Sequence, residues 1–263
     1  MRAKKSLGQH FLTSQHVLKK IITAANLRPS DTVLEIGPGK GILTKALLQT
    51  AARVVAVEKD AVLAAYLADI FSHQISDKQL TLVSGDILDF DLSLYKLTPG
   101  TYKVVANIPY YITGVFFRRF LSSATYPESM TLLVQKEVAE RIIAKTGKES
   151  LFSISVKAYG TPKQVGVVRA GNFSPPPKVD SAILTITDIS KSQFNDIDEQ
   201  SFFTVLHAGF AHKRKQLATN FGLAHMLAPE KMCTHCTIPP SVRAEDLSVR
   251  HWICLAQAYR DTK

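Results

Sequence analysis

The sequence has few of the residues that mark secreted, membrane-spanning or disulfide-stabilised proteins. Its 263 residues include 3 cysteines and 1 tryptophan. So few cysteines, in an odd number, argue against a disulfide framework and favour reduced thiols. No apolar run approaches the roughly 18 residues of a membrane span, and the basic N-terminus lacks the apolar stretch of a secretory signal. These absences predict a soluble cytoplasmic protein with no membrane partner.

Acidic residues are scarce relative to basic ones. The chain has 32 lysines and arginines against 22 aspartates and glutamates, a formal net charge of +10. Residues 1–30 contain basic side chains and no acidic one. Clustered bases attract polyanions, because neutralising phosphates releases condensed counterions. The distribution therefore favours a nucleic acid partner, although ordinary solubility charge would give the same net value.

Buried strands and amphipathic helices alternate through the first half of the chain. With 46% hydrophobic residues, a sizeable core can form. The alternation predicts an α/β fold with a doubly wound, mainly parallel sheet and right-handed crossovers. Apolar spacing predicts helices at 15–25, 42–48, 61–71 and 135–144, and strands at 32–36, 53–57, 80–83, 102–106 and 130–134.

The C-terminal part has helical patterns only. Residues 188–200 are polar without periodicity, which predicts a linker. After it, residues 202–210, 213–221 and 245–259 have helical spacing. We therefore predict two domains, an α/β domain over 1–190 with a basic arm at 1–12, and a helical domain over 191–263.

A glycine-rich turn, Glu35-Ile-Gly-Pro-Gly-Lys-Gly41, follows the first predicted strand of the sheet. Missing side chains at Gly37 and Gly39 let a ligand approach the backbone and the helix N-terminus. Glu58, about 20 positions further on at the tip of the second strand, is placed to accept hydrogen bonds from a cofactor ribose. The combination predicts a nucleotide-like cofactor.

The spacing of these glycines separates two cofactor classes. The dinucleotide fingerprint G-x-G-x-x-G requires glycine at position 42, where this chain has Ile42. The pattern instead resembles the first motif of methyltransferases, which favours S-adenosylmethionine and leaves a dehydrogenase as an alternative. Asp86, after the third strand, is then placed to accept a hydrogen bond from the adenine amine of the cofactor.

The fourth strand ends at Asn107-Ile-Pro-Tyr110. The amine of an aromatic base is a poor nucleophile, because its lone pair is delocalised into the ring. The Asn107 side-chain oxygen and the Ile108 carbonyl could accept its two hydrogens and favour a pyramidal nitrogen. Pro109 would stiffen the turn, while Tyr110 and Phe173 would stack on the two faces of an extruded base.

Five segments of the sequence form a set of motifs, namely Gly8-Gln-His-Phe-Leu12, Glu35–Gly41, Asn107–Tyr110, Gln135-Lys-Glu-Val138 and Phe173-Ser-Pro-Pro-Pro-Lys-Val-Asp-Ser181. Together they resemble the ribosomal RNA adenine dimethyltransferases. This family includes the KsgA-type enzymes of the small subunit and the Erm-type enzymes of the large subunit. His212-Lys-Arg-Lys215 and Arg243-Ala-Glu-Asp-Leu-Ser248 are more similar to the KsgA branch.

The resemblance implies a Rossmann-like class I S-adenosylmethionine-dependent methyltransferase domain before the helical domain. It implies a monomer that dimethylates adjacent adenines of small-subunit (16S) rRNA during ribosome biogenesis, with rRNA or a small-subunit precursor as partner. It places Tyr110 and Phe173 at the target base. The implied cofactor contacts are His10, Leu12, Gly37, Gly39, Glu58, Asp86 and Asn107.

Alternatives remain at this stage. An Erm-like enzyme would act on large-subunit rRNA and confer macrolide resistance, and a non-catalytic RNA-binding assembly or transcription factor could use the same fold. Cys233-Thr-His-Cys236 and His251-Trp-Ile-Cys254 have zinc-like spacing, but we expect reduced thiols and no metal. Phosphate contacts are predicted for basic residues of the arm and of one C-terminal helix start: Lys4, Lys5, Lys213, Arg214 and Lys215.

Overall fold

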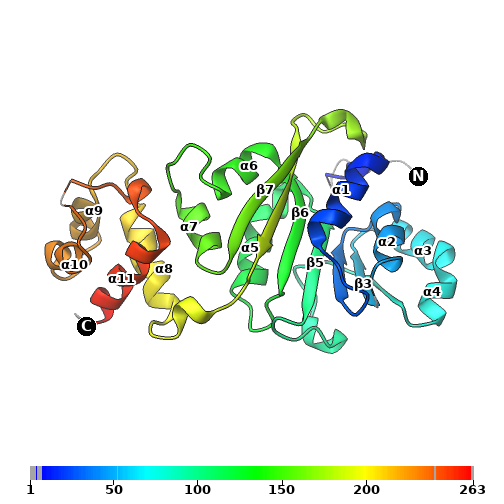
Figure 1. The fold of residues 1–263 in the computed structure, drawn as a ribbon, viewed down its shortest axis with the longest axis horizontal. Helices are drawn as coiled ribbons and strands as arrows, with labels where there is room; N and C mark the ends of the chain where they lie inside the picture. Colours follow the sequence, from blue (N-terminus) through cyan, green and yellow to red (C-terminus); the bar gives the residue numbers. More distant parts are fainter. Residues whose placement is uncertain (1–3, 5–7, 52, 240, 262–263) are drawn as a thin grey trace. The chain divides into compact units, whose positions relative to one another are not determined.

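The structure is a computed structural model that describes residues 4, 8–51, 53–239 and 241–261 (Figure 1). The chain divides into two compact units. The first combines residues 1–139 and 161–189, and the second combines residues 140–160 and 190–263. The predicted division lay near residue 190 alone and assigned residues 140–160 to the first domain. That segment contains α7 (Leu151–Lys157), which packs against α8 (Glu199–Gly209) of the second unit.

A seven-stranded mixed sheet forms the centre of the first unit, with the strand order β4-β3-β2-β5-β6-β9-β7. The first five strands in this order are parallel, and β9 and β7 are antiparallel to their neighbours. The strands are β2 (Thr32–Ile36), β3 (Arg53–Glu58), β4 (Leu80–Ser84), β5 (Tyr102–Asn107), β6 (Ser129–Gln135), β7 (Thr161–Val168) and β9 (Ser181–Thr187).

The order of the strands reverses between β2 and β5. From β2 the chain continues through β3 and β4 toward one edge, and from β5 it continues through β6 toward the other. Right-handed crossovers then place the connecting helices of the two halves on opposite faces. The carboxyl ends of β2 and β5 diverge at this reversal, which is where ligands bind in such sheets.

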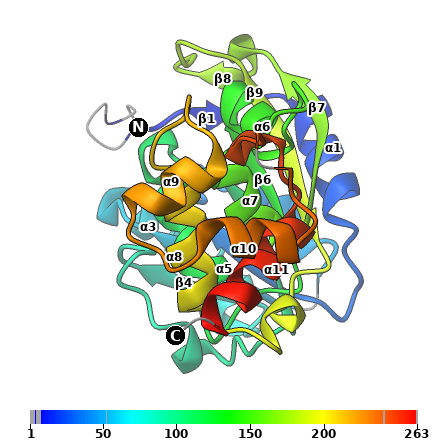
Figure 2. The same ribbon diagram turned by 90° about the vertical axis from the view of Figure 1, so that its left-hand side faces the viewer.

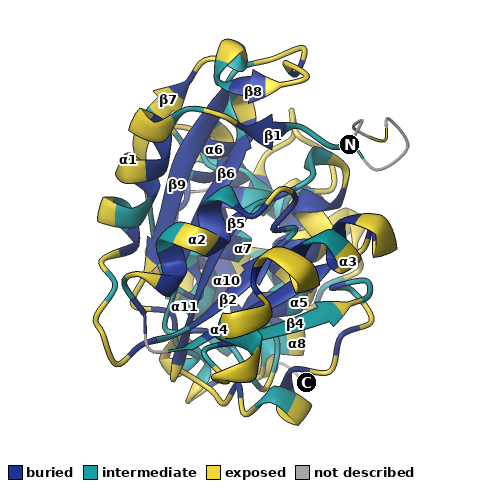
Figure 3. Cartoon of the chain, turned by 90° about the vertical axis from the view of Figure 1, so that its right-hand side faces the viewer, coloured by how far each residue is buried: buried dark blue, intermediate teal, exposed yellow. Residues whose placement is uncertain are grey.

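Three helices share a hydrophobic core with the sheet. They are α1 (Gln15–Ala25), α2 (Ile42–Leu48) and α3 (Ala61–Ile70), whose apolar faces pack with buried residues of β2, β3 and β5. Figure 3 shows the buried strands behind α1 and α2, whose outward surfaces are exposed. The helix α5 (Thr113–Leu121) connects β5 to β6 and buries Phe116, Phe117 and Phe120. Buried apolar side chains thus hold helices from both halves of the chain to the sheet.

The second unit is helical in all of its described elements apart from short turns (Figure 2). Besides α7 and α8 it contains α9 (Leu217–Leu223), α10 (Pro229–His235) and α11 (Val249–Arg260). Its core includes Phe202, Phe221 and Trp252, each fully buried. Gly209 faces Trp252 so closely that a Cβ there would lie 2.4 Å from the indole. The absence of a side chain at Gly209 therefore allows this tight packing.

The structure corrects three details of the predicted C-terminal part. Residues 213–215 lie in a turn before α9, not at a helix start. The helix α10 was not predicted, and α8 begins at Glu199, inside the expected linker. Across the part of the chain that the structure describes, no helix is long and apolar enough to span a membrane.

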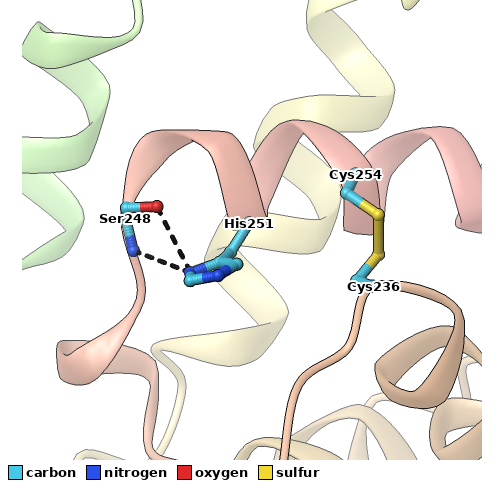
Figure 4. Close-up of a disulfide and its surroundings, with 4 residues drawn as sticks. All are labelled: Cys236, Ser248, His251 and Cys254. Atoms are coloured by element: carbon cyan, nitrogen blue, oxygen red, sulfur yellow. Dashed lines mark hydrogen bonds between the residues drawn. A yellow bond between two sulfur atoms is a disulfide. The ribbon is translucent and has the colours of Figure 1, made fainter.

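The expectation of reduced thiols is wrong for two of the three cysteines. Cys236, at the end of α10, and Cys254, in α11, form a disulfide with their Cα atoms 5.8 Å apart (Figure 4). Cys233 is the free cysteine, and it is buried. His251 turns back toward the start of its own helix, where its Nδ1 lies 3.2 Å from the Ser248 hydroxyl. Of the residues with zinc-like spacing, Cys236 and Cys254 thus form a disulfide, His251 caps its helix and Cys233 stays free.

Candidate active site

A pocket lies at the reversal of strand order in the first unit, beyond the carboxyl ends of β2, β3 and β5. The N-terminal arm contributes Gly8–Leu12 to its wall. The structure therefore brings together residues that are far apart in the sequence. Every residue predicted from the motifs to touch the cofactor lines this pocket, namely His10, Leu12, Gly37, Gly39, Glu58, Asp86 and Asn107.

The glycine loop is held open by left-handed backbone conformations. Gly37 and Gly39 have φ values of 65° and 60°, which favour glycine. The Gly39 amide donates a 3.0 Å hydrogen bond to Glu58 Oε2, and the Asp60 amide donates one of 2.8 Å to Glu58 Oε1. Burial raises the pKa of Glu58, and these two amide bonds oppose that rise. Glu58 thus also fixes the shape of the loop that it faces.

Glu35 is the most isolated carboxyl group of the pocket wall. It is 1% exposed, at the end of β2. Neither of its carboxyl oxygens has a hydrogen-bond partner among the described residues. Burial raises its pKa from 4.5 to about 8. A ligand with a hydrogen-bond donor or a positive charge would satisfy these oxygens.

Asp86 follows β4 and is partly exposed at the pocket edge. Its Oδ2 accepts a 2.6 Å bond from the Lys59 ammonium, and its Oδ1 accepts the Leu88 amide. Burial raises the pKa of Asp86, but the Lys59 hydrogen bond and the Leu88 amide outweigh this effect and hold it below the usual value. Asp86 is therefore an ionised hydrogen-bond acceptor at the edge of the pocket.

Asn107 ends β5 and is oriented by the arm. Its Nδ2 donates a 2.9 Å hydrogen bond to the backbone carbonyl of His10. The side-chain oxygen of Asn107 is consequently left to accept hydrogens on the pocket side. The His10 ring is held in turn by a 2.8 Å contact between its Nδ1 and the Pro175 carbonyl. His10 thus connects the arm both to Asn107 at the end of β5 and to Pro175.

Tyr110 begins a short 3-10 turn, η3 (Tyr110–Ile112), directly after Pro109. Its hydroxyl lies 2.7 Å from the Ser181 hydroxyl, and its ring is stacked with the His10 ring at a centroid distance of 6.0 Å. Burial raises the pKa of Tyr110, so the phenol is neutral at physiological pH. Ile108 and Pro109 also line the pocket. A rigid, neutral aromatic surface therefore stands beside Asn107.

Phe173 does not line the pocket in this structure. It is 4% exposed and packs in the core shared by α1 and α2. Its backbone pairs with Leu12, because β8 (Phe173–Ser174) is antiparallel to β1 (Phe11–Leu12) of the arm. The structure thus brings Phe173 to the arm, but it does not present the ring opposite Tyr110.

The predicted RNA-binding residues have different surroundings. The Lys4 ammonium forms a 2.8 Å ion pair with Asp60, so this lysine helps attach the arm to the end of β3. Lys5 lies outside the described residues. Lys213, Arg214 and Lys215 are exposed on the turn between α8 and α9 of the second unit.

The described residues contain no cluster of histidine, cysteine or acidic side chains that could hold a metal ion.

The pocket wall also contains residues that sequence reasoning did not single out, among them Glu35, Lys59 and Tyr111. Glu35 stands directly before the glycine loop, and Tyr111 directly after Tyr110. Their positions beside recognised motifs were the available signal. The sequence did not indicate how far each of these side chains is buried, because adjacent residues such as Tyr110 and Tyr111 differ in exposure.

Comparisons with known proteins show the family to which the chain belongs. The family model described as ribosomal RNA adenine dimethylase matches residues 1–261. A ribosomal RNA small subunit methyltransferase A from Dehalococcoides mccartyi (strain BAV1) is 43% identical over 265 residues, covering 98% of this chain and 89% of the relative. A crystal structure of a dimethyladenosine transferase from Plasmodium falciparum has a TM-score of 0.80 at 27% identity, covering 96% and 98% of the two chains.

The structure of the 23S rRNA methyltransferase ErmE has a TM-score of 0.75 at 24% identity, with 95% of this chain and 99% of that chain covered. At that identity the likeness shows the fold alone. The family is shown by the family model, which matches residues 1–261, and by the Dehalococcoides mccartyi relative, which is 43% identical. The chain belongs to the ribosomal RNA adenine dimethylase family.

Proposed function

We propose that this protein is an S-adenosylmethionine-dependent enzyme that dimethylates the exocyclic amine of adjacent adenines in small-subunit rRNA. The observation that carries the proposal is the pairing of Asn107 Nδ2 with the His10 carbonyl, which leaves the Asn107 side-chain oxygen to act as an acceptor in the pocket that Tyr110 also lines. An adenine in this pocket could donate an amine hydrogen to the Asn107 oxygen and stack its ring on Tyr110. Small-subunit rRNA is favoured over large-subunit rRNA by the relatives named for small-subunit methylation.

The residues of the pocket fit the proposed cofactor. Glu58 offers carboxylate oxygens for ribose hydroxyls beside the open glycine loop. Glu35 offers buried carboxyl oxygens without a hydrogen-bond partner among the described residues, which a hydrogen-bond donor of the cofactor would satisfy. Asp86 offers an ionised acceptor for the adenine amine. When bound, S-adenosylmethionine supplies an electrophilic methyl group on a sulfonium.

The chain's own residues prepare the attacking amine. Asn107 and the Ile108 carbonyl accept the two amine hydrogens, which favours the pyramidal nitrogen of the transition state. Tyr110 stacks on the extruded base and fixes its plane. Holding the nitrogen in line with the methyl carbon supplies most of the acceleration. The proton released after attack passes to water, so no strong base is required.

Two alternatives predict different results. An Erm-like enzyme would modify large-subunit rRNA. A non-catalytic RNA-binding factor would modify neither subunit, yet its pocket would have no need of both Asn107 and Glu58 in these hydrogen-bonded positions. We further propose that the protein acts as a monomer in the cytoplasm, on rRNA in a precursor of the small subunit.

The test is mass spectrometry of adenines in rRNA from cells with and without this protein. Dimethyladenine should disappear from small-subunit rRNA in its absence and return when the wild-type chain is supplied. Loss from large-subunit rRNA instead would support the Erm-like alternative. Unchanged adenines in both subunits would reject the enzymatic proposal.

A further inference from the structure

Tyr111 is an exposed aromatic residue on the rim of the pocket. Its side chain is 60% exposed, although it lines the same pocket as Tyr110. Among the described phenylalanine, tyrosine and tryptophan residues, it alone is exposed. The two consecutive tyrosines therefore have different surroundings, because Tyr110 is half-buried and bonded to Ser181 while Tyr111 faces solvent.

The position of Tyr111 is defined by the elements around it. It lies within η3, between the end of β5 and the start of α5. Its ring packs against the arm, since a Cβ at Gly8 would lie 3.5 Å from Tyr111 Cδ1. Val115, one turn further on, is 54% exposed. The Tyr111 ring therefore lies against the arm at Gly8 while most of its surface stays exposed.

An extruded base leaves a gap in its strand. The neighbouring base then loses a stacking partner, and unstacking costs a few kcal/mol per base step. An aromatic ring outside the pocket can replace the lost partner, because every base has a π-face that stacks on tyrosine.

We infer that Tyr111 stacks on the nucleotide next to the target adenine and thereby helps to select an extruded conformation of the RNA. This inference rests on the proposed function, because it requires a target base in the pocket. Tyr110 holds the reacting base inside, and Tyr111 holds its neighbour outside. The residue contributes to substrate binding and not to the transfer of the methyl group.

The inference is tested by steady-state kinetics of the full-length protein on reconstituted small subunits that lack these methyl groups. We compare wild type with Tyr111→Ala and Tyr111→Phe, and use Leu94→Ala as control, because Leu94 is 75% exposed and does not line the pocket. Each variant is assayed on natural rRNA and on rRNA in which one of the two adjacent target adenines is abasic, with methylation of the other adenine as the readout. Thermal unfolding and S-adenosylmethionine affinity are measured for each.

On natural rRNA, Tyr111→Ala should raise KM about 5- to 100-fold with little change in kcat, the scale of one base–aromatic stack. Tyr111→Phe and Leu94→Ala should behave as wild type. On the abasic rRNA, wild type and Tyr111→Ala should have equal KM values, because the stacking partner is missing from both.

Two results would overturn the inference while leaving the proposed function intact. One is an unchanged KM for Tyr111→Ala on natural rRNA. The other is an equal rise in KM on natural and abasic rRNA, which would indicate a contact other than stacking on that base. A wild-type protein inactive on both substrates would instead reject the proposed function, and this is read from the wild type alone.

Discussion

The two units place their candidate functional residues in opposite environments. In the first unit, Glu58 and Asn107 at the strand ends are buried or half-buried and hydrogen-bonded to backbone atoms of Gly39 and His10. In the second unit, the candidate RNA contacts are exposed on a turn. Burial with defined partners suits selective chemistry, whereas exposed charge suits affinity for a flexible polyanion. Mutations in the two units should therefore have different signatures.

The largest expected effect lies in the first unit. Asn107→Ala removes the acceptor for the amine hydrogens and the bond to the His10 carbonyl. We expect the single-turnover rate to fall about 100- to 1000-fold, the scale for one preorganised polar contact to a transition state. Affinity for rRNA should change little. Rapid-quench measurement of methyl transfer checks this, and a wild-type rate would remove Asn107 from the mechanism.

The disulfide tests the stability of the second unit. It links residues 236 and 254, a sequence separation of 18. Replacing both cysteines by serine should lower the free energy of unfolding of this unit by about 3 kcal/mol, because a loop of that length gains entropy in the unfolded chain. The matched control is Cys233→Ser, which leaves the disulfide in place. Equal chemical denaturation curves for wild type and the double variant would contradict the structural role.

Glu35 tests the cost of burial in the first unit. Its pKa is raised from 4.5 to about 8, so the folded protein keeps a proton that the unfolded chain releases. Stability is therefore greatest at low pH with respect to this group and falls as pH rises, by up to about 1.4 kcal/mol per pH unit over that interval. Glu35→Gln cannot ionise and should lack this slope. Denaturation of both proteins at a series of pH values checks the difference.

Substitutions of Glu58 should affect cofactor binding and leave rRNA binding largely unchanged. Glu58→Ala should weaken S-adenosylmethionine binding by about 1–3 kcal/mol, through lost hydrogen bonds and a loosened glycine loop. Glu58→Gln keeps one acceptor and should lose less. Calorimetry with the cofactor and a separate rRNA-binding assay distinguish the two effects. An unchanged cofactor affinity would show that the ribose assignment is incorrect.

The contrast also explains what could be predicted from the sequence. The strands β2 and β3 and the helices α1 and α2 were predicted within a residue of their observed ends, because each has a clear apolar period. Glu58, Asp86 and Asn107 were predicted to share a site because parallel strands bring their ends together, whereas His10 and Leu12 of the arm were predicted from the family resemblance alone. Local pattern and topology agree in this half of the chain.

Other features depend on contacts between distant residues. The pairing of Cys236 with Cys254 requires their helices to pack, and no local pattern encodes it. The assignment of α7 to the second unit depends on its packing against α8. The isolation of Glu35 and the burial of Phe173 depend on surrounding side chains. The short helix α10 begins at Pro229 and has too few residues for a recognisable period.

The smallest effect is expected for the exposed basic turn of the second unit. Lys213, Arg214 and Lys215 are all exposed, so their charges are solvated and screened by salt. If they contact rRNA phosphates, their replacement by alanine should reduce the salt dependence of rRNA binding by about one unit of slope per lost contact. Affinity for S-adenosylmethionine should be unchanged, because none of the three residues lines the pocket. Binding titrations across a series of salt concentrations check this, with Lys231→Ala on α10 as a single-charge comparison. An unchanged slope in the triple variant would mean that the turn is ordinary solvated surface, and affinity for rRNA would then depend on the first unit.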